Sequence, residues 1–325
     1  MAQRYSRIRF SFRAPNPWNN FSCPMPAQHP FARQLQVLRV LRLHRYLSVE
    51  QIAALVFTTS SRRACQACCT KLHRKGYVHR FELTRGGLGG GRSSYIYALA
   101  PAGAQVLSQA ADIPIVDIPV DPDAPTAKSV FVHHQLAANR CLVAVWQASR
   151  QSPGTHVRQW TSDPFSRVRY LPRGAKLQRS VHPDAIVMLQ VHDREHWAFL
   201  EVDRGTQPLK RYAAKVRRYA RFWLSKTWPS VYPIFPAVRV VSITATRAVA
   251  IAELAADVID QFDQLPYERL RDGMYVAATS EAELVADPFG AIWRPAYGPR
   301  DARHAWCVDG PSASAGPRAG TSAGR

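Results

Sequence analysis

The chain has 325 residues, of which 46% are hydrophobic and 20% charged, and its formal net charge is +20. This composition excludes a chain that is disordered throughout, and the absence of any apolar run near 18 residues or of a secretory leader predicts a cytoplasmic protein with no membrane partner. A positive charge of this size favours a polyanionic partner, above all nucleic acid, over a merely solvated basic surface.

The charge is concentrated in the first third of the chain. Residues 1–100 hold 16 Lys or Arg, and their only acidic residues are Glu50 and Glu82, which leaves a net charge of +14. Within this third, residues 1–30 are basic and interrupted by proline, and we expect them to form a disordered arm.

Three helices are predicted after this arm. A broad apolar face predicts the first over residues 31–47. Ser48 is followed three residues later by Gln51, which is the signature of a capping box and predicts a short second helix. The third helix should end before Gly76, where a left-handed C-terminal cap is favoured.

Two strand-like runs follow, at 77–83 and 94–99, joined by the glycine-rich segment "TRGGLGGGRS", and Pro101 begins a further helix. Helix, short helix, turn, helix and basic hairpin is the order of elements in a winged helix-turn-helix. We therefore expect residues 31–110 to form a DNA-binding domain of this fold. The alternative is a winged helix that is used only for protein contacts.

Basic residues of the third helix and of the glycine-rich loop are the candidate DNA contacts. A helix with an apolar stripe on one side and Lys and Arg on the other can lie in the major groove while its basic residues contact phosphates. A flexible loop with an arginine at each end suits a wing that reaches the DNA backbone. The predicted DNA-binding residues are Arg62, Arg63, Lys71, Arg74 and Lys75 on the helix, and Arg85 and Arg92 in the loop.

The third helix also contains the cysteine-rich sequence "CQACCTKLH", which raises the question of a metal site. Cys65, Cys69 and Leu72 recur at helical spacing, where a free cysteine behaves as a small hydrophobic residue. No second Cys or His pair lies at the spacing of a zinc ribbon. Core packing is therefore favoured over metal binding by Cys65, Cys68, Cys69 and His73.

The composition changes after the winged-helix region. Residues 111–127 are rich in proline and contain four Asp but no Lys or Arg, which predicts a linker over 111–128. Strands and helices then alternate, so an α/β domain is expected over 129–285, and a disordered tail rich in Ala, Gly, Ser and Pro over 286–325. The expected elements of this domain are a helix from about residue 130, strands at 181–190, 197–203 and 238–244, and helices at 208–225 and 249–262.

Two carboxylates lie two residues apart in the sequence "FLEVDRGT", and in a strand Glu201 and Asp203 would point to the same face. If "VHDREH" turns the chain between Asp193 and Arg194, Asp184 of the preceding strand lies directly across from Asp203. Three converging carboxylates repel one another unless a cation compensates, and Mg²⁺ prefers oxygen ligands of this kind. The open alternative is an ion-pair network with Arg204 and the basic helix that follows.

The spacing Pro-Asp, sixteen residues, then Glu-x-Asp resembles the core of the PD-(D/E)XK nucleases, with Asp184 and Glu201 in the matching positions. The chain departs from the motif at its lysine, where Asp203 stands, and Lys210 or Lys215 of the next helix could supply the missing ammonium group. The catalytic set that this resemblance implies is Asp184, Glu201, Asp203 and Lys215. A degenerate domain that is kept for DNA binding is an equal alternative.

Several segments together resemble the replication-relaxation family of plasmids and other mobile elements of bacteria, across about residues 31–225. The segments that carry the resemblance are "LRLHRYLSVEQIAALVF", "KLHRKGYVHRF", "YIYALAPAGAQVL", "HHQLAANRCLVAV", "HPDAIV" and "FLEVDRGTQPLKRYAAKVRRY". The resemblance implies a role in plasmid replication and DNA relaxation through DNA binding. A relaxase of the HUH type is disfavoured, because His133 and His134 are adjacent rather than separated by a hydrophobic residue; "HHQLAAN" is expected to begin a helix that packs on the sheet.

The sequence therefore predicts an α+β protein, with an N-terminal winged helix-turn-helix followed by a restriction-endonuclease-like α/β domain. The leading function is double-stranded DNA binding in the replication, relaxation or transfer of a mobile element, with replication or transfer proteins as further partners. One alternative is an Mg²⁺-dependent endonuclease, and another is a winged-helix transcriptional regulator. The oligomeric state, including a homodimer, stays open.

Overall fold

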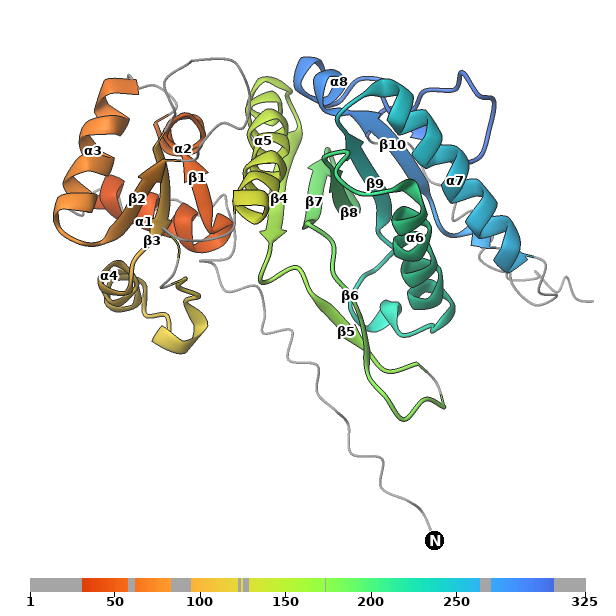
Figure 1. The fold of residues 1–325 in the computed structure, drawn as a ribbon, viewed down its shortest axis with the longest axis horizontal. Helices are drawn as coiled ribbons and strands as arrows, with labels where there is room; N and C mark the ends of the chain where they lie inside the picture. The colour runs from red at the N-terminus through yellow and green to blue at the C-terminus, as the bar shows by residue number, and fades with distance from the viewer. Residues whose placement is uncertain are drawn as a thin grey trace, which may run out of the picture.

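A computed structural model describes residues 31–57, 62–82, 95–121, 124, 129–172, 174–263 and 270–306. Within these ranges the chain is a mixed α+β protein, in which a small helical half with a short sheet stands beside a larger half built on a mixed sheet (Figure 1). The predicted arm over 1–30 lies outside the described residues. Among the described residues, none of the helices combines the length and the hydrophobicity that a membrane span requires.

The N-terminal half contains four helices in its described residues and a small antiparallel sheet with the strand order β1-β3-β2. Strand β1 follows the first helix directly and pairs with β3. The sequence did not predict this strand. The elements are α1 (Ala32–His44), β1 (Tyr46–Ser48), α2 (Val49–Val56), α3 (Arg62–Arg74), β2 (Val78–Glu82), β3 (Tyr95–Leu99) and α4 (Pro101–Ala111).

The local signals in this half act as predicted. The Ser48 hydroxyl accepts a hydrogen bond from the Gln51 backbone, and the Gln51 side chain accepts one from the Ser48 backbone, so the capping box begins α2. Gly76 has a φ of 71°, the left-handed conformation that ends a helix at little cost for glycine. Pro101 occupies the first turn of α4.

The C-terminal half is built on a sheet that has six strands in the described residues, in the order β11-β10-β9-β8-β7-β4. Strands β4, β7 and β8 are antiparallel neighbours, whereas β8, β9 and β10 are parallel. Its elements are α5 (Ser129–Gln151), β4 (Thr155–Ser162), β5 (Val168–Tyr170), β6 (Arg179–Val181), β7 (Ala185–Val191), β8 (Arg194–Asp203), α6 (Leu209–Leu224), β9 (Ala237–Ser242), α7 (Ala245–Asp263), β10 (Val276–Ser280), α8 (Glu281–Ala286) and β11 (Arg294–Pro295).

Helices cover both faces of this sheet. Along β8, Leu200 and Val202 lie in one apolar cluster with the α5 residues, whereas Phe199 lies in a second cluster with α6 and α7. The alternation follows from the two-residue period of a strand. The helix predicted from "HHQLAAN" is thus confirmed as α5, and it packs on one side of the sheet, while α6 and α7 lie on the other (Figure 1).

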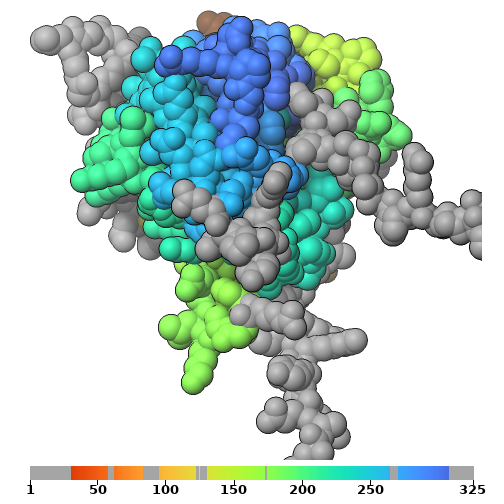
Figure 2. Space-filling model, turned by 90° about the vertical axis from the view of Figure 1, so that its right-hand side faces the viewer, coloured from red at the N-terminus to blue at the C-terminus, as the bar shows by residue number. Residues whose placement is uncertain are grey.

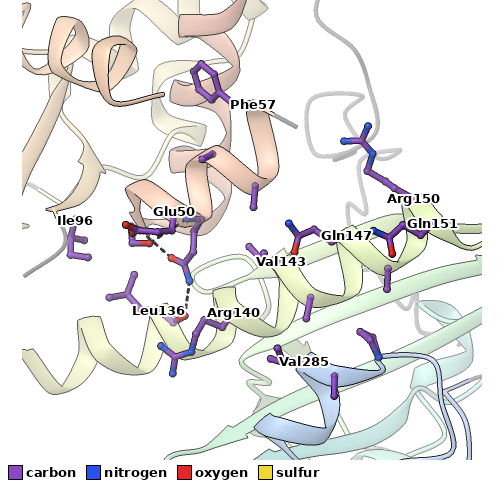
Figure 3. A pocket seen from close by; sticks show the side chains of 18 of the residues that line it. Glu50, Phe57, Ile96, Leu136, Arg140, Val143, Gln147, Arg150, Gln151 and Val285 are labelled. Carbon is purple, nitrogen blue, oxygen red and sulfur yellow. Dashed lines mark hydrogen bonds between the residues drawn. The ribbon is translucent and has the colours of Figure 1, made fainter. Parts of the chain in front are cut away.

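Helix α5 also joins the two halves. The buried Asn139 side chain donates hydrogen bonds to the backbone oxygens of His44 and Tyr46, at 3.1 and 2.7 Å. Gln51 of α2 donates to the backbone oxygen of Leu136 on α5, at 2.8 Å, beside an open groove that is lined by α2, α5 and α8 (Figure 3). One continuous apolar cluster includes residues of both halves, so the halves share a core.

The acidic segment that was expected to be a linker lies against the N-terminal half in its described part. Ile113 and Ile118 are buried in the shared core, on either side of a short 3₁₀ turn. Asp121 accepts hydrogen bonds from the Tyr46 hydroxyl and from Arg45. The acidic segment thus brings the Asp121 carboxylate into contact with Arg45 of the basic first third of the chain.

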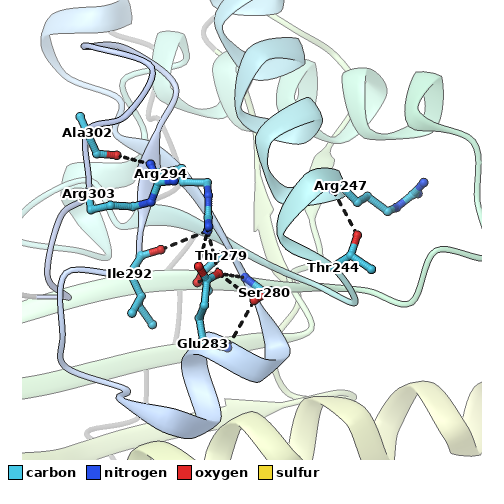
Figure 4. A network of polar contacts seen from close by, with 9 residues as sticks. All are labelled: Thr244, Arg247, Thr279, Ser280, Glu283, Ile292, Arg294, Ala302 and Arg303. Carbon is cyan, nitrogen blue, oxygen red and sulfur yellow. Dashed lines mark hydrogen bonds and ion pairs between the residues drawn. The ribbon is translucent and has the colours of Figure 1, made fainter.

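The prediction of a disordered tail from residue 286 is wrong for residues 286–306. Trp293 and Trp306 are buried against each other in the shared core, and β11 adds an edge to the sheet. The Arg294 guanidinium binds both carboxylate oxygens of Glu283 in the capping box of α8, and its hydrogen bond lowers the pKa of that carboxyl to about 2 (Figure 4). The stretch rich in Ala, Gly, Ser and Pro over 310–325 lies outside the described residues.

Candidate nucleic-acid interface and acidic cluster

Helix α3 lies at the edge of the molecule that is farthest from the large sheet (Figure 1). One side of it is buried through Cys65, Cys69 and Leu72, which confirms that the two cysteines are core residues. The predicted DNA-binding residues of this helix are all exposed: Arg62, Arg63, Lys71, Arg74 and Lys75. The helix therefore presents a basic surface to solvent while its apolar stripe anchors it.

The basic side chains of α3 have different surroundings. Arg62 forms an ion pair with Glu50 of α2, with 2.5 Å between the guanidinium nitrogen and the carboxylate oxygen. The Lys75 ammonium lies over the rings of Phe31 and Tyr77, at 5.1 and 5.7 Å from their centroids. Arg63, the next residue of α3, is exposed to solvent. The predicted wing residues Arg85 and Arg92 lie outside the described residues.

The arrangement of the acidic cluster depends on the register of the β7–β8 hairpin, which differs from the predicted register. Val191 pairs with Arg194, so the turn consists of His192 and Asp193, and its centre lies one residue earlier than the sequence suggested. Ala185 pairs with Leu200, which places Asp184 across from Glu201. The predicted pairing of Asp184 with Asp203 is wrong, because a one-residue displacement of the turn shifts every pair by two.

Glu201 is the most buried carboxylate of the cluster, with 2% of its surface exposed. It accepts hydrogen bonds from the Tyr219 hydroxyl, at 2.6 Å, and from the Lys215 ammonium, both on α6. Burial raises the pKa of Glu201 and the nearby charge of Asp184 adds to the shift, while Lys215 opposes it. Burial lowers the pKa of Lys215, but the charges of Glu201 and Asp184 outweigh it and the net shift is upward, so the ammonium stays charged.

Asp184 lies where the α5 layer meets the end of β7. His134 of α5 contacts one of its carboxylate oxygens at 2.9 Å, and the Val202 backbone N–H donates to the other at 2.7 Å. Burial raises the pKa of Asp184, yet its hydrogen bond with His134 and the charge of Lys215 outweigh this effect and lower it. No role for His134 was expected from the sequence, although its place at the start of the helix that covers the sheet could have suggested one.

Asp203 belongs to the same face of β8 but has its own partners. The Arg247 guanidinium on α7 binds both of its carboxylate oxygens, and the Ser242 hydroxyl donates to one of them at 3.1 Å. The cation that binds Asp203 is therefore Arg247 of α7, which the sequence did not suggest, whereas the basic helix of the expected ion-pair network contributes Lys215. The hydrogen bond to Asp203 raises the pKa of Arg247.

These contacts bear on whether the cluster fits a divalent metal. Each of the three carboxylates has a cationic or ionisable partner, so the mutual repulsion that would call for Mg²⁺ is already compensated: His134 pairs with Asp184, Lys215 with Glu201, and Arg247 with Asp203. Within the described residues, no group of three or more His, Cys, Asp or Glu side chains is arranged to hold a metal ion. The side chains as placed do not fit an Mg²⁺ site, and they form a buried ion-pair network instead.

Comparison with known protein families gives one match. The profile of the family described as Replication-relaxation matches residues 38–238, which is more than half of the chain. The match runs from α1 to the first residues of β9 and therefore includes α3, α5 and the β7–β8 hairpin with its acidic cluster. Neither the curated proteins nor the solved structures give a match.

Proposed function

Because the chain belongs to the replication-relaxation family, we propose that it is a double-stranded DNA-binding protein of a plasmid or other mobile element, acting in replication, DNA relaxation or transfer. The observation that carries this proposal is the exposed basic side of α3, opposite its buried cysteine stripe. A net charge of +20 adds a long-range attraction to the phosphate backbone.

The arrangement around α3 supports a winged helix-turn-helix as the DNA-reading unit. Helices α1, α2 and α3 pack together, strand β1 lies between α1 and α2, and strands β2 and β3 follow α3, which agrees with the order of elements in that fold. In such a unit the third helix enters the major groove with its N-terminal residues toward the base edges. Arg63 is the residue of that turn which we assign to base contacts, because Arg62 is held by Glu50.

The second half supports a restriction-endonuclease-like arrangement with a binding role. Strands β4, β7 and β8 form an antiparallel meander after α5, and β9 returns parallel to β8 after α6. Asp184, Glu201 and Lys215 meet at the centre of this arrangement, where the resemblance to PD-(D/E)XK nucleases placed its acids and a relocated lysine. Since Lys215 of α6 pairs with Glu201 and His134 of α5 pairs with Asp184, we assign these groups to holding α5 and α6 on the sheet and not to cleavage.

Titration of the full chain with a duplex of mixed sequence tests the proposal. Fluorescence anisotropy at several salt concentrations should give an affinity that falls steeply, with a log–log slope of about 0.9 per phosphate contact. The variant R63A/R74A should bind more weakly, whereas Arg300→Ala, which removes another exposed arginine that pairs with Glu253, should bind as the parent does. A salt-independent affinity, or none, contradicts the proposal.

Supercoiled plasmid separates the binder from the enzyme. The full chain, with Mg²⁺ and without it, should retard the plasmid in a gel without nicking it. Nicking that requires Mg²⁺, and that is lost in a Lys215→Met variant which thermal melting shows to be folded, would instead establish the endonuclease alternative.

A further inference from the structure

A two-stranded arm projects from the large half of the molecule. This β5–β6 arm (residues 167–172 and 174–181) lies outside the main sheet and extends beyond the body of the molecule in two perpendicular views (Figures 1 and 2). Its base is fixed, because Val168, Tyr170 and Val181 are buried and the Tyr170 ring packs against Phe222 of α6, with 4.7 Å between the centroids. The arm is thus an anchored projection.

The arm is basic on both of its faces. Arg169 is exposed and alternates with the buried Tyr170, so it points away from α6, whereas Arg179 pairs with Tyr170 across the ribbon and shares its face. Residues 164–183 contain no Asp or Glu. Near the end of the arm Lys176 is exposed, and Leu177, with 79% of its surface exposed, is among the most exposed large hydrophobic residues that the structure describes.

The basic surface continues from the arm onto α6. Arg211, Arg218 and Arg221 are exposed and recur at helical spacing on one side of this helix. Burial raises the pKa of Tyr170, and the charges of Arg179 and Arg221 oppose that shift, which places both guanidinium groups near its hydroxyl. No Asp or Glu occurs over residues 204–252. The acidic residues of the neighbouring α7 begin only at Glu253, so α6 and the first turns of α7 contain no acid that would offset these arginines.

We infer that the β5–β6 arm is a second DNA contact, which enters a groove of the duplex and directs arginines from its two faces to the phosphates on either side. The inference rests on the proposed DNA-binding function and extends it from α3 to the other half of the molecule. A major groove about 12 Å wide admits a two-stranded ribbon. A ribbon that lay flat on the outside of the duplex would need basic residues on one face alone, but the arm has them on both. A merely solvated arm would not need an exposed leucine near its end, but Leu177 is exposed there.

The experiment compares full-length variants on the same duplex. R169A/R179A removes one arginine from each face of the arm, R63A/R74A removes two basic residues of α3, and Arg300→Ala, whose guanidinium pairs with Glu253 of α7, is the control. Each lost phosphate contact should weaken binding about fivefold near 0.15 M salt and reduce the log–log salt slope by about 0.9. We therefore expect R169A/R179A to bind roughly thirtyfold more weakly, with the magnitude of its salt slope reduced by about two. It should also lose hydroxyl-radical protection at one part of the footprint. The part of the footprint that R63A/R74A loses should stay protected in R169A/R179A.

The outcomes distinguish this inference from the proposed function. If R63A/R74A weakens binding but R169A/R179A leaves affinity, salt slope and footprint unchanged, the arm is not a DNA contact although the protein is a DNA-binding protein. If the parent chain does not bind duplex DNA, the proposed function itself fails. Single-stranded DNA of the same length should compete poorly for the arm. If it displaces the duplex from the parent as well as duplex DNA does, and if this competition is lost in R169A/R179A, the arm does not insert into a groove. Thermal melting of each variant checks that the exposed substitutions leave the fold intact.

Discussion

Asn139 of α5 donates its side-chain amide to the backbone oxygen of Tyr46, at 2.7 Å, across 93 residues of sequence. The same amide donates to the backbone oxygen of His44, so one buried side chain satisfies two carbonyl groups at the point where α1 ends and β1 begins. A buried carbonyl that loses its partner costs about 1–3 kcal/mol, which makes this contact a strong link between the halves.

We expect Asn139→Ala to lower the free energy of unfolding of the full chain by about 1–3 kcal/mol, because the two carbonyl groups lose their donor. Gln147→Ala, on the exposed side of the same helix, should change it by less than about 0.5 kcal/mol. Urea unfolding followed by tryptophan fluorescence measures both. Equal effects of the two substitutions would show that the Asn139 contact does not stabilise the junction.

Arg62 and Arg63 should differ in their effect on DNA binding. Arg63→Ala should cost about 1–3 kcal/mol on preferred sites and relax the sequence preference, if its guanidinium pairs with a base. Arg62→Ala should cost less, because Glu50 already neutralises that side chain. Selection from a random duplex pool, followed by affinity measurements on preferred and scrambled sites, tests this order. A uniform loss on all sequences for Arg63→Ala would assign it to phosphates.

The Glu201–Lys215 pair should behave as a buried ion pair. Lys215→Met leaves the Glu201 carboxylate buried without its cation and should destabilise the fold by about 3–5 kcal/mol, as should Glu201→Gln through the stranded ammonium. The double variant E201Q/K215M should recover much of that loss, because neither charge is left uncompensated. Calorimetry with and without Mg²⁺ completes the test: a melting temperature of the parent that rises with Mg²⁺ and does not rise in Glu201→Gln would restore the metal site.

The contact between His134 and Asp184 predicts a pH dependence of stability. Burial lowers the pKa of His134, but the hydrogen bond to Asp184 outweighs it and the net shift is upward from 6.5. A group whose pKa is raised in the folded state stabilises the fold below its unfolded pKa and loses that contribution as pH rises through the folded value. Unfolding free energies measured from pH 5.5 to 9 should therefore decline more in the parent than in His134→Gln.

His133 provides the matched control for this titration. It is adjacent on α5, but burial and the charges of Arg204 and Arg140 lower its pKa, so its contribution has the opposite sign. His133→Gln should leave the decline above pH 6.5 in place. If both variants kept the decline, it would have to come from another group.

Local patterns in the sequence predicted local structure well. The capping box of Ser48 and Gln51 and the glycine at position 76 each have a mechanism that acts within a few residues, and the structure contains both. The apolar periodicity of α5, α6 and α7 likewise identified those helices, because an amphipathic helix needs no information from distant residues to reveal its buried side. The family assignment rested on longer segments and was correct.

What the sequence could not supply was the pairing of distant residues. The register of β7 and β8 depends on which two residues form the turn, and an error of one residue moved Asp184 from Glu201 to Asp203. Arg247 and His134, which are 44 and 50 residues from the acids they bind, carried no local signal for these roles. Strand β11 and the buried Trp306 were missed because a composition rich in small residues says nothing about an edge strand that the sheet itself recruits.

The shared helix α5 also limits how this protein can be recombined. Protein engineers often move a DNA-reading unit from one chain to another by cutting at the residue where its fold ends. Here a cut after residue 110 would separate His44 and Tyr46 from Asn139, and Gln51 from Leu136. A chimera must carry α5 and the acidic segment that looked like a dispensable spacer, and the side of α5 that packs on the large sheet must be covered there as well.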